Sequence, residues 1–198
     1  MAELNHLPWQ GWESVRLIGR GSFGTVYEIQ KRLEDGHRVS AAVKVITIPQ
    51  DPSEIDELRS EGYDREGIAA IFRTRIQSIV NEYSFMRKLD GSANVVNCSD
   101  IAYVRHPDDM GWDVFIRMEL LTPMLKVLPA EVPEDTVIRI GKDLCTALMQ
   151  CKKHEIVHRD IKPQNIFFSA NGDCKLGDFG IANTIESTTG GTKTGTYK

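Results

Sequence analysis

The sequence lacks a surplus of positive charge, a long apolar run and a leader-like N-terminus. Its 198 residues carry 24 Lys and Arg against 28 Asp and Glu, a formal net charge of −4. Proteins that bind nucleic acid or anionic membranes usually show a basic patch, which this balance does not support. No apolar run approaches the roughly 20 residues of a membrane span, and MAELNHLPWQ lacks the charged-then-apolar order of a signal peptide. We therefore expect a cytoplasmic protein with no nucleic-acid partner and no membrane contact within this chain.

Cysteine is also scarce, with four in the whole chain: Cys98, Cys145, Cys151 and Cys174. No two of them form a C-x-x-C pair, and their neighbours do not supply the spacing of a zinc site. Two of the four fall within one predicted helix. The sequence therefore predicts reduced, structural thiols.

A glycine-rich segment near the N-terminus interrupts one predicted strand and precedes another. Glycines at 19, 21 and 24 follow the apolar positions Val15, Leu17 and Ile18, and the strand pattern resumes at Val26. G-x-G-x-x-G alone is compatible with a dinucleotide-binding fold, but that fold requires a helix after the last glycine. Because β-branched residues follow instead, the pattern favours a hairpin whose backbone N–H groups approach phosphate oxygens closely. A plain structural hairpin is the alternative.

The next segments read as a strand, a linker and a long helix. Residues 39–48 are rich in β-branched side chains, and Lys44 is their only charge. An acidic stretch over 49–67, broken by proline and glycine, predicts a linker with a short helix. Apolar residues at helical spacing predict a helix over 68–89. Glu82 lies among the apolar positions of that helix, where a carboxylate requires a cation partner.

The middle of the chain alternates strand and helix patterns. Strands are predicted at 94–104 and 112–118, and an extended segment at 118–123 stops at a proline. A helix is predicted from Pro133 to about Lys153, with acidic residues in its first turn. Its inward stripe is predicted to consist of Val137, Ile138, Ile140, Leu144 and Leu148.

The stretch VHRDIKPQNIFFSANGDCKLGDFG, residues 157–180, carries most of the chemistry. Asn171 and Gly172 predict a tight turn between two short strands. Acidic, amide and lysine side chains are thereby placed at the two ends of one hairpin. A polar loop without chemistry is the alternative for this stretch, and a metal-ligand role is the alternative for His158.

The order H-R-D-x-K-x-x-N followed by D-F-G strongly resembles the catalytic core of protein kinases. The glycine hairpin, Lys44 in the local form AAVK, Glu82 and the MELLTP segment extend the resemblance, which covers Trp12 to Lys198. The wording of GWDVFIRMELLTP is most similar to bacterial serine/threonine kinases. The resemblance implies an ATP-dependent enzyme that acts on Ser or Thr hydroxyls of a protein substrate.

The resemblance also implies a set of site residues. The catalytic residues are Asp160 as base or orienting group, Lys162 beside the transferring phosphoryl, and the Lys44–Glu82 pair. Those implied to bind ATP are Gly19, Gly21, Ser22, Phe23, Gly24, Val26, Ala42, Lys44, Met118, Glu119, Leu121 and Phe167. Asn165 and Asp178 are the implied Mg²⁺ ligands. His158 and Phe179 are then core residues that pack together.

The implied fold class is α+β and protein-kinase-like. It consists of a five-stranded antiparallel N-lobe sheet with helix C, plus an incomplete helical C-lobe. Residues 1–11 would form an N-terminal extension, 12–121 the N-lobe and hinge, and 122–198 a partial C-lobe. The segment after Gly180 would be the activation segment, where Thr188, Thr189, Thr192 and Thr194 include the expected autophosphorylation sites and Arg159 is a candidate phosphate partner.

The sequence departs from the family at its C-terminal end, before an A-P-E motif. We expect a fragment of a longer kinase that retains ATP binding but binds protein substrates poorly. An exposed apolar face on the incomplete lobe would favour self-association. The alternative function is a nucleotide-binding or scaffolding module without transfer activity.

Overall fold

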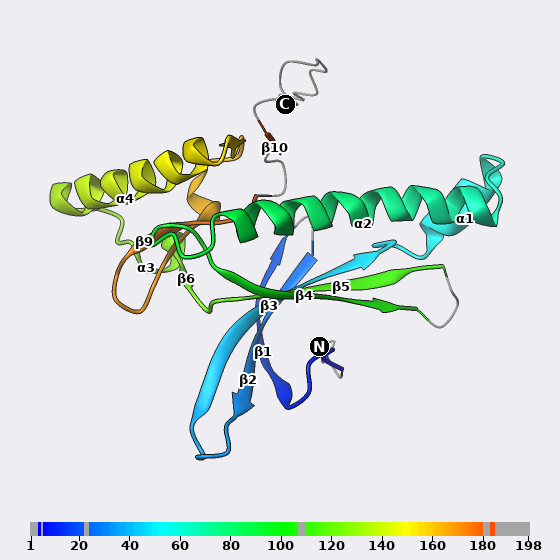
Figure 1. Cartoon of the computed structure of the whole chain (residues 1–198), viewed down its shortest axis with the longest axis horizontal. Coiled ribbons are helices and arrows are strands. Elements are labelled where there is room, and N and C mark those ends of the chain that lie inside the picture. The colour runs from blue at the N-terminus through cyan, green and yellow to red at the C-terminus, as the bar shows by residue number, and fades with distance from the viewer. Residues whose placement is uncertain (1–3, 5, 22–23, 107–109, 180–182, 185–198) are drawn as a thin grey trace. The chain divides into compact units, whose positions relative to one another are not determined.

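The computed structural model describes residues 4, 6–21, 24–106, 110–179 and 183–184 of the chain (Figure 1). They belong to two compact units. The first unit is made of residues 1–83 and 97–121, and the second of residues 84–96 and 122–198. The domain boundaries predicted from the sequence stay a prediction.

The first unit contains an antiparallel sheet of five strands, in the order β1-β2-β3-β5-β4. The strands are β1 (Trp12–Gly21), β2 (Gly24–Arg32), β3 (Arg38–Ile48), β4 (Cys98–Arg105) and β5 (Trp112–Met118). β-Branched residues dominate the central strand β3, where they fit a pleated and largely buried surface. The predicted fold class, with its five-stranded sheet, is confirmed.

Two helices follow β3. They are α1 (Ser53–Ser60) and α2 (Arg65–Lys88), and the last turn of α2 belongs to the second unit. In the first unit, α2 lies along the sheet (Figure 1), and its Ile68 and Phe72 are fully buried. Arg75 of α2 forms an ion pair with Glu54 of α1. The short helix expected in the linker is therefore present and is tied to α2.

An apolar cluster on the sheet is covered by the N-terminal segment. Tyr27, Ile29, Ala41, Val43 and Phe115 form the cluster, and Leu4, Leu7, Trp9 and Trp12 are among the residues that pack against it. The side chains thus span β2, β3 and β5. Part of the predicted N-terminal extension therefore contributes to the core of the first unit.

The second unit is built from one long helix and three small pieces of sheet. Its elements are β6 (Thr122–Pro123), α3 (Met124–Val127), α4 (Glu134–Lys153), β7 (Ile156–Val157), the 3₁₀ turn η1 (Pro163–Asn165), β8 (Ile166–Phe168), β9 (Cys174–Leu176) and β10 (Asn183–Thr184). β8 pairs with β9 and with β6, while β7 pairs with β10. The predicted hairpin is confirmed, with Ser169 and Asp173 closing its loop.

Two sequence predictions are wrong in this region. The strand expected from residue 94 begins at Cys98, because Asn94 and Val96 direct their backbone groups to Leu176 of β9 instead of to β5. The inward stripe expected on α4 is also displaced. Ala147 and Cys151 are its buried residues, and Ile140 and Leu144 of the predicted stripe are half-buried, whereas Val137, Ile138 and Leu148 are exposed.

The described cysteines are all free thiols, as predicted. Burial raises the pKa of the Cys174 thiol to about 11, so this residue stays protonated at neutral pH. None of the described helices is both long enough and apolar enough to cross a membrane.

Candidate functional site

Lys44 and Glu82 form a nearly buried ion pair in the first unit. The ammonium nitrogen Nζ of Lys44 lies 3.3 Å from Oε1 of Glu82, and the two side chains are 14% and 8% exposed. β3 holds Lys44 between β2 and β5, where it faces Val26 and Ile116 in register. α2 supplies Glu82, as predicted from the spacing of that helix. A lysine fixed in this way presents its charge at a defined position beside the sheet.

The glycine hairpin joins β1 to β2 next to this pair. Gly19 is in register with Val26, and Gly21 is in register with Gly24. Gly24 has a φ of +142°, and a Cβ at this position would lie 2.4 Å from the carbonyl oxygen of Val45. Only glycine fits here, because the backbone of β2 approaches β3 this closely. Ser22 and Phe23, predicted to contact the nucleotide, lie outside the described residues.

Gly24→Ala should therefore destabilise the first unit. The expected loss of unfolding free energy is about 1–3 kcal/mol, the usual cost of a backbone held in a disfavoured conformation. Gly141→Ala is the matched control, since Gly141 lies in α4 and a Cβ there would meet nothing within 4 Å. Urea unfolding measures both variants, and equal stability of Gly24→Ala and wild type would contradict the steric argument.

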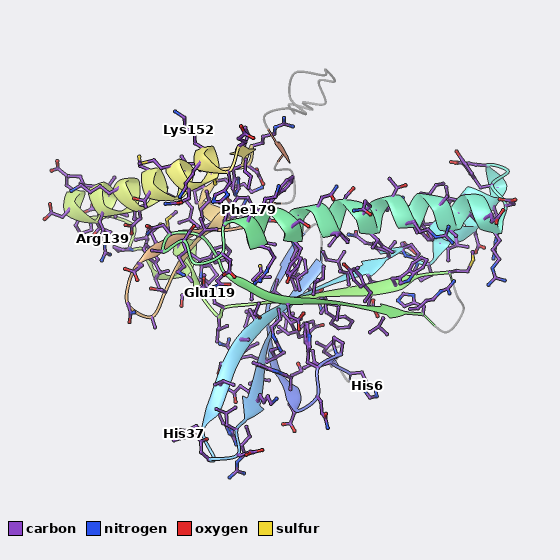
Figure 2. The ribbon with its side chains drawn as sticks, in the orientation of Figure 1. His6, His37, Glu119, Arg139, Lys152 and Phe179 are labelled. Carbon is purple, nitrogen blue, oxygen red and sulfur yellow. The ribbon has the colours of Figure 1, made fainter. Side chains whose placement is uncertain are left out.

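The end of β5 carries residues that the sequence predicts to line a nucleotide or to form a hinge. Ala42 is buried and lies in register with Met118. The side chain of Glu119, labelled in Figure 2, accepts a hydrogen bond from the backbone N–H of Asn97 at 2.7 Å. The backbone N–H of Glu119 donates in turn to the Asn97 carbonyl at 3.1 Å. This pair of bonds fixes Glu119 against Asn97, two residues before the end of the first unit at Leu121.

The second unit brings three predicted site residues together. Oδ2 of Asp160 accepts bonds from Nζ of Lys162 at 2.6 Å and from Nδ2 of Asn165 at 2.9 Å. Nδ2 of Asn165 also donates to the Asp160 carbonyl at 2.9 Å. Asn165 ends the turn η1 and is buried. One carboxylate oxygen, Oδ2, is thus held by two side chains, which fixes the orientation of the carboxylate. Neither of these two bonds uses the other oxygen, Oδ1.

The Lys162 hydrogen bond, more than any other interaction, holds the pKa of the Asp160 carboxyl below its ordinary value. Asp160 is therefore ionised at neutral pH. Because its folded-state pKa lies below the unfolded one, the pair contributes stability above about pH 4. That contribution is lost as the pH falls through the folded-state pKa.

Lys162→Met should raise the pKa of Asp160 toward its ordinary value, since the charged hydrogen-bond donor is lost. ¹³C NMR titration of the carboxyl carbons measures this pKa directly and needs no enzymatic activity. Lys175→Met, on β9, is the control that keeps the donor to Asp160 intact. An Asp160 pKa that is the same in Lys162→Met and wild type would contradict the assignment.

His158 is a buried core residue, as the kinase resemblance implies. The backbone N–H of Asp160 donates to its Nδ1 at 3.2 Å, so the ring proton is on Nε2, which donates to the Gly177 carbonyl at 3.0 Å. The ring centroid lies 4.5 Å from that of Phe179, which is fully buried and labelled in Figure 2. Both ring nitrogens of His158 are thus used in bonds to the backbone, at Asp160 and at Gly177. We interpret the ring as a structural support for Asp160 and not as a base.

Burial lowers the pKa of His158, and protonation of Nδ1 would displace the Asp160 N–H bond. As the pH falls, His158 therefore binds a proton at a higher pH in the unfolded chain than in the folded chain. Stability supplied by the neutral ring is present above the unfolded pKa of about 6.5 and is lost as the pH falls through the folded value.

We expect the unfolding free energy to fall between pH 7.5 and 5.5, by at most about 1.4 kcal/mol per pH unit for one proton. His158→Phe should reduce this pH dependence, whereas His37→Ala should retain it, because His37 is an exposed loop residue. Urea unfolding at the two pH values measures the effect. The same slope in His158→Phe as in wild type would contradict the linkage.

Asp178 and Asn165 are the predicted metal ligands, and both belong to the second unit. Asp178 has a φ of +60°, a left-handed conformation that Asp tolerates better than most residues. The part of the chain that the structure describes contains no group of three His, Cys, Asp or Glu side chains able to hold a metal. A carboxylate and an amide fit Mg²⁺, which keeps several water and phosphate oxygens as ligands.

Residues that the sequence does not single out support this hairpin. Asn94 and Asp143 bond the backbone of β9, and Gly177 is enclosed by Val96 and Phe167. In the sequence the only signal is Asn94 directly before two valines, a pattern that predicts the start of a strand and not a buried amide. Asp143 gave no signal, since an acidic residue in a helix is ordinarily solvated.

Comparisons with known proteins agree with the geometry. The family model described as "Protein kinase domain" matches residues 12–198 of this chain. The chain is 31% identical over 173 residues to "Cyclin-dependent kinase 2" of Caenorhabditis elegans. The aligned residues are 87% of this chain and 40% of that protein. It is 30% identical over 177 residues to "Cyclin-dependent kinase 4" of Mus musculus, covering 86% and 52%. A probable serine/threonine-protein kinase of Clostridium perfringens is 29% identical over 180 residues, covering 90% and 22%.

The chain spans about half or less of the length of these curated relatives. The match nevertheless takes in both units, from the first strand of the sheet through the hairpin that carries Asp178. The family resemblance predicted from the motifs is confirmed, and the chain belongs to the protein kinase domain family.

Proposed function

We propose that this chain carries the catalytic core of a protein serine/threonine kinase, which transfers the γ-phosphate of ATP to a Ser or Thr hydroxyl. The observation that carries the proposal is the Asp160–Lys162–Asn165 cluster. Lys162 and Asn165 both hold Oδ2 of Asp160. An ionised carboxylate with one oxygen fixed and a second oxygen available is suited to orient a hydroxyl and accept its proton.

Lys162 has a second role in the proposal. Phosphoryl transfer requires positioning and charge neutralisation more than covalent chemistry. An ammonium group held 2.6 Å from Oδ2 of Asp160 would lie near the transferring phosphoryl, where it would offset the negative charge. A lysine two residues after the aspartate is also typical of serine/threonine kinases rather than tyrosine kinases, which supports the Ser/Thr specificity.

The first unit would bind the nucleotide. Lys44, oriented by Glu82, would pair with the α- and β-phosphates, and Gly19, Gly21 and Gly24 would allow backbone N–H groups to approach the phosphates. Ala42, Val26 and Met118 would form the apolar wall for adenine. The backbone N–H of Glu119 is bonded to Asn97. We therefore expect the backbone carbonyl of Glu119 to recognise adenine. Leu121, at the end of this unit, and Phe167, on β8 of the second unit, are the remaining residues predicted to contact the nucleotide.

Asn165 and Asp178 would hold Mg²⁺. The ion, when bound, neutralises phosphate charge and orients the γ-phosphate. The Asn165 amide nitrogen faces Asp160, which leaves its amide oxygen as the ligand atom. Autophosphorylation of the threonines after residue 184, a cytoplasmic location and self-association stay predictions, and these threonines lie outside the described residues.

The test is mass spectrometry of the chain incubated with Mg-ATP, beside Asp178→Asn. Phosphothreonine in the wild type alone would support transfer by this core. Thermal stabilisation by Mg-ATP without any phosphate would instead favour a nucleotide-binding module. The absence of both phosphate and thermal stabilisation would refute the proposed function. Circular dichroism checks that Asp178→Asn is folded.

A further inference from the structure

The outer edge of β9 is bonded by groups that are not part of any strand. β9 lies at the end of the sheet β6-β8-β9, with β8 as its neighbour on one side. On the other side, the Leu176 N–H donates to the Asn94 carbonyl, and the Val96 N–H donates to the Leu176 carbonyl, both at 2.9 Å. The segment 94–96 thus replaces a neighbouring strand beside Leu176.

Two side chains bond the remaining groups of this edge, at Cys174. Nδ2 of Asn94 donates to the Cys174 carbonyl at 2.9 Å, and the Cys174 N–H donates to Oδ2 of Asp143 at 2.9 Å. Asn94 is only 8% exposed, and Cys174 is buried. A buried backbone group that loses its partner is costly, so both side chains contribute to the position of β9.

The hold on β9 continues to the residue before Asp178. The Gly177 N–H donates to the Asn165 carbonyl at 2.9 Å, and its carbonyl accepts from His158 at 3.0 Å. A Cβ at Gly177 would lie 2.7 Å from Cγ2 of Val96. Gly177 is therefore fixed by bonds on two sides and by close packing against the segment that contains Asn94.

Asp178 follows directly, with its left-handed backbone at φ +60°. Such a conformation persists where the surrounding structure determines it. On one side the determinants are Asn165 and His158, already part of the site. On the other side they are β9 and the segment 94–96, which are joined by Asn94.

We propose that Asn94 and Asp143 are positioning residues for Asp178: they bond both backbone groups of Cys174 and so fix the strand that carries the metal-ligand carboxylate. The inference rests on the proposed function, in which Asp178 is an Mg²⁺ ligand. Neither residue touches the reacting atoms. After either substitution, β9 keeps its pairing with β8 and both backbone bonds of Leu176, so the strand loosens without being lost.

The first measurement is hydrogen exchange of the amides at 174–178 in the chain without nucleotide. Asn94→Ala and Asp143→Ala should exchange faster at these amides than wild type. Asn81→Ala and Asp135→Ala are the matched controls, because both residues are exposed on helices and neither contributes a bond to β9. Asp143→Asn, which keeps an oxygen acceptor, should be closer to wild type than Asp143→Ala.

The second measurement is the Mg²⁺ dependence of ATP binding, followed by calorimetry or thermal shift. The Mg²⁺ concentration for half-maximal effect should rise by about 10-fold or more in Asn94→Ala and Asp143→Ala, as for other partners of metal ligands. ATP affinity at saturating Mg²⁺ should change little, and this split would not arise from a general loss of stability. If an alanine variant fails to fold, Asn94→Ser or Asp143→Ser, whose shorter side chains move the bonding group away from Cys174, takes its place.

Unchanged exchange at 174–178, or an unchanged Mg²⁺ midpoint in variants that bind ATP, would overturn the inference. A parallel loss of ATP affinity and Mg²⁺ response would also overturn it, since that indicates a purely structural role. Failure of the proposed function looks different. The wild type itself would then show no Mg²⁺-dependent ATP binding, and the inference would fall with it before any variant is compared.

Discussion

Asp160→Asn should lower kcat for phosphate transfer by about 10²- to 10⁴-fold, the usual contribution of a positioned base. The substitution keeps an oxygen that can accept the bonds from Lys162 and Asn165, so the geometry of the cluster is preserved. It removes the negative charge and the ability to accept a proton. ATP affinity should stay close to wild type, because the proposed nucleotide contacts lie on other residues. Radiolabelled phosphate transfer to casein, with calorimetry for ATP, measures both quantities.

The control for this substitution is Asp173→Asn, which makes the same chemical change on the exposed loop between β8 and β9. It should retain wild-type transfer. The assignment of Asp160 would be refuted by an Asp160→Asn variant that transfers phosphate at the wild-type rate. A loss of ATP binding together with transfer would point to a wider disturbance of the second unit, and circular dichroism would then detect it.

The parts of the site that could be predicted from the sequence depend on local patterns. The hairpin of β8 and β9 follows from two apolar runs around Asn171-Gly172, and Gly172 has the positive φ that such a loop requires. Lys44 and Glu82 could be named because each is a charge among apolar neighbours at a position that resembles the protein-kinase pattern. Their distance could not be predicted, since it depends on how β3 and α2 pack.

The failures involve contacts between residues far apart in the chain. Asn94 looked like the start of a strand because two valines follow it, yet its side chain bonds Cys174, 80 residues away. On α4, the period of the apolar residues predicts an amphipathic helix but not which face meets a neighbour. The helix packs against β7 and β9, and its buried residues, Ala147 and Cys151, are too small to indicate that face from the sequence.

The N-terminal segment shows the same limit most clearly, because residues 1–11 have no periodic pattern. The Trp9 ring lies edge-on to Phe115, with centroids 6.4 Å apart. The Arg117 guanidinium carbon lies 4.8 Å from the centroid of Trp9 and 5.0 Å from that of Trp12. Arg117 is therefore held between two indole rings, an arrangement that stabilises a cation through the ring quadrupole.

Trp9→Ala should lower the free energy of unfolding of the first unit by about 2–3 kcal/mol. This is below the ~3–5 kcal/mol of a fully buried aromatic, because Trp9 is only partly buried. The loss combines uncovered apolar surface on β2, β3 and β5 with one of the two contacts to Arg117. Trp9→Phe should recover most of the stability, since an aromatic ring still covers the cluster. Urea unfolding followed by circular dichroism measures the series.

Gln10→Ala is the matched control, because Gln10 is the exposed neighbour of Trp9 and should leave stability unchanged. Arg117→Met retains apolar cover but removes the cation, and with it the bond to Ser99 and the ion pair with Asp100; the ring contacts alone should account for about 0.5–1 kcal/mol of its cost. If Trp9→Ala is as stable as Gln10→Ala, the N-terminal segment does not belong to the core of this unit. If only Arg117→Met is destabilised, the polar and ring contacts of Arg117 matter and the apolar cover of Trp9 does not.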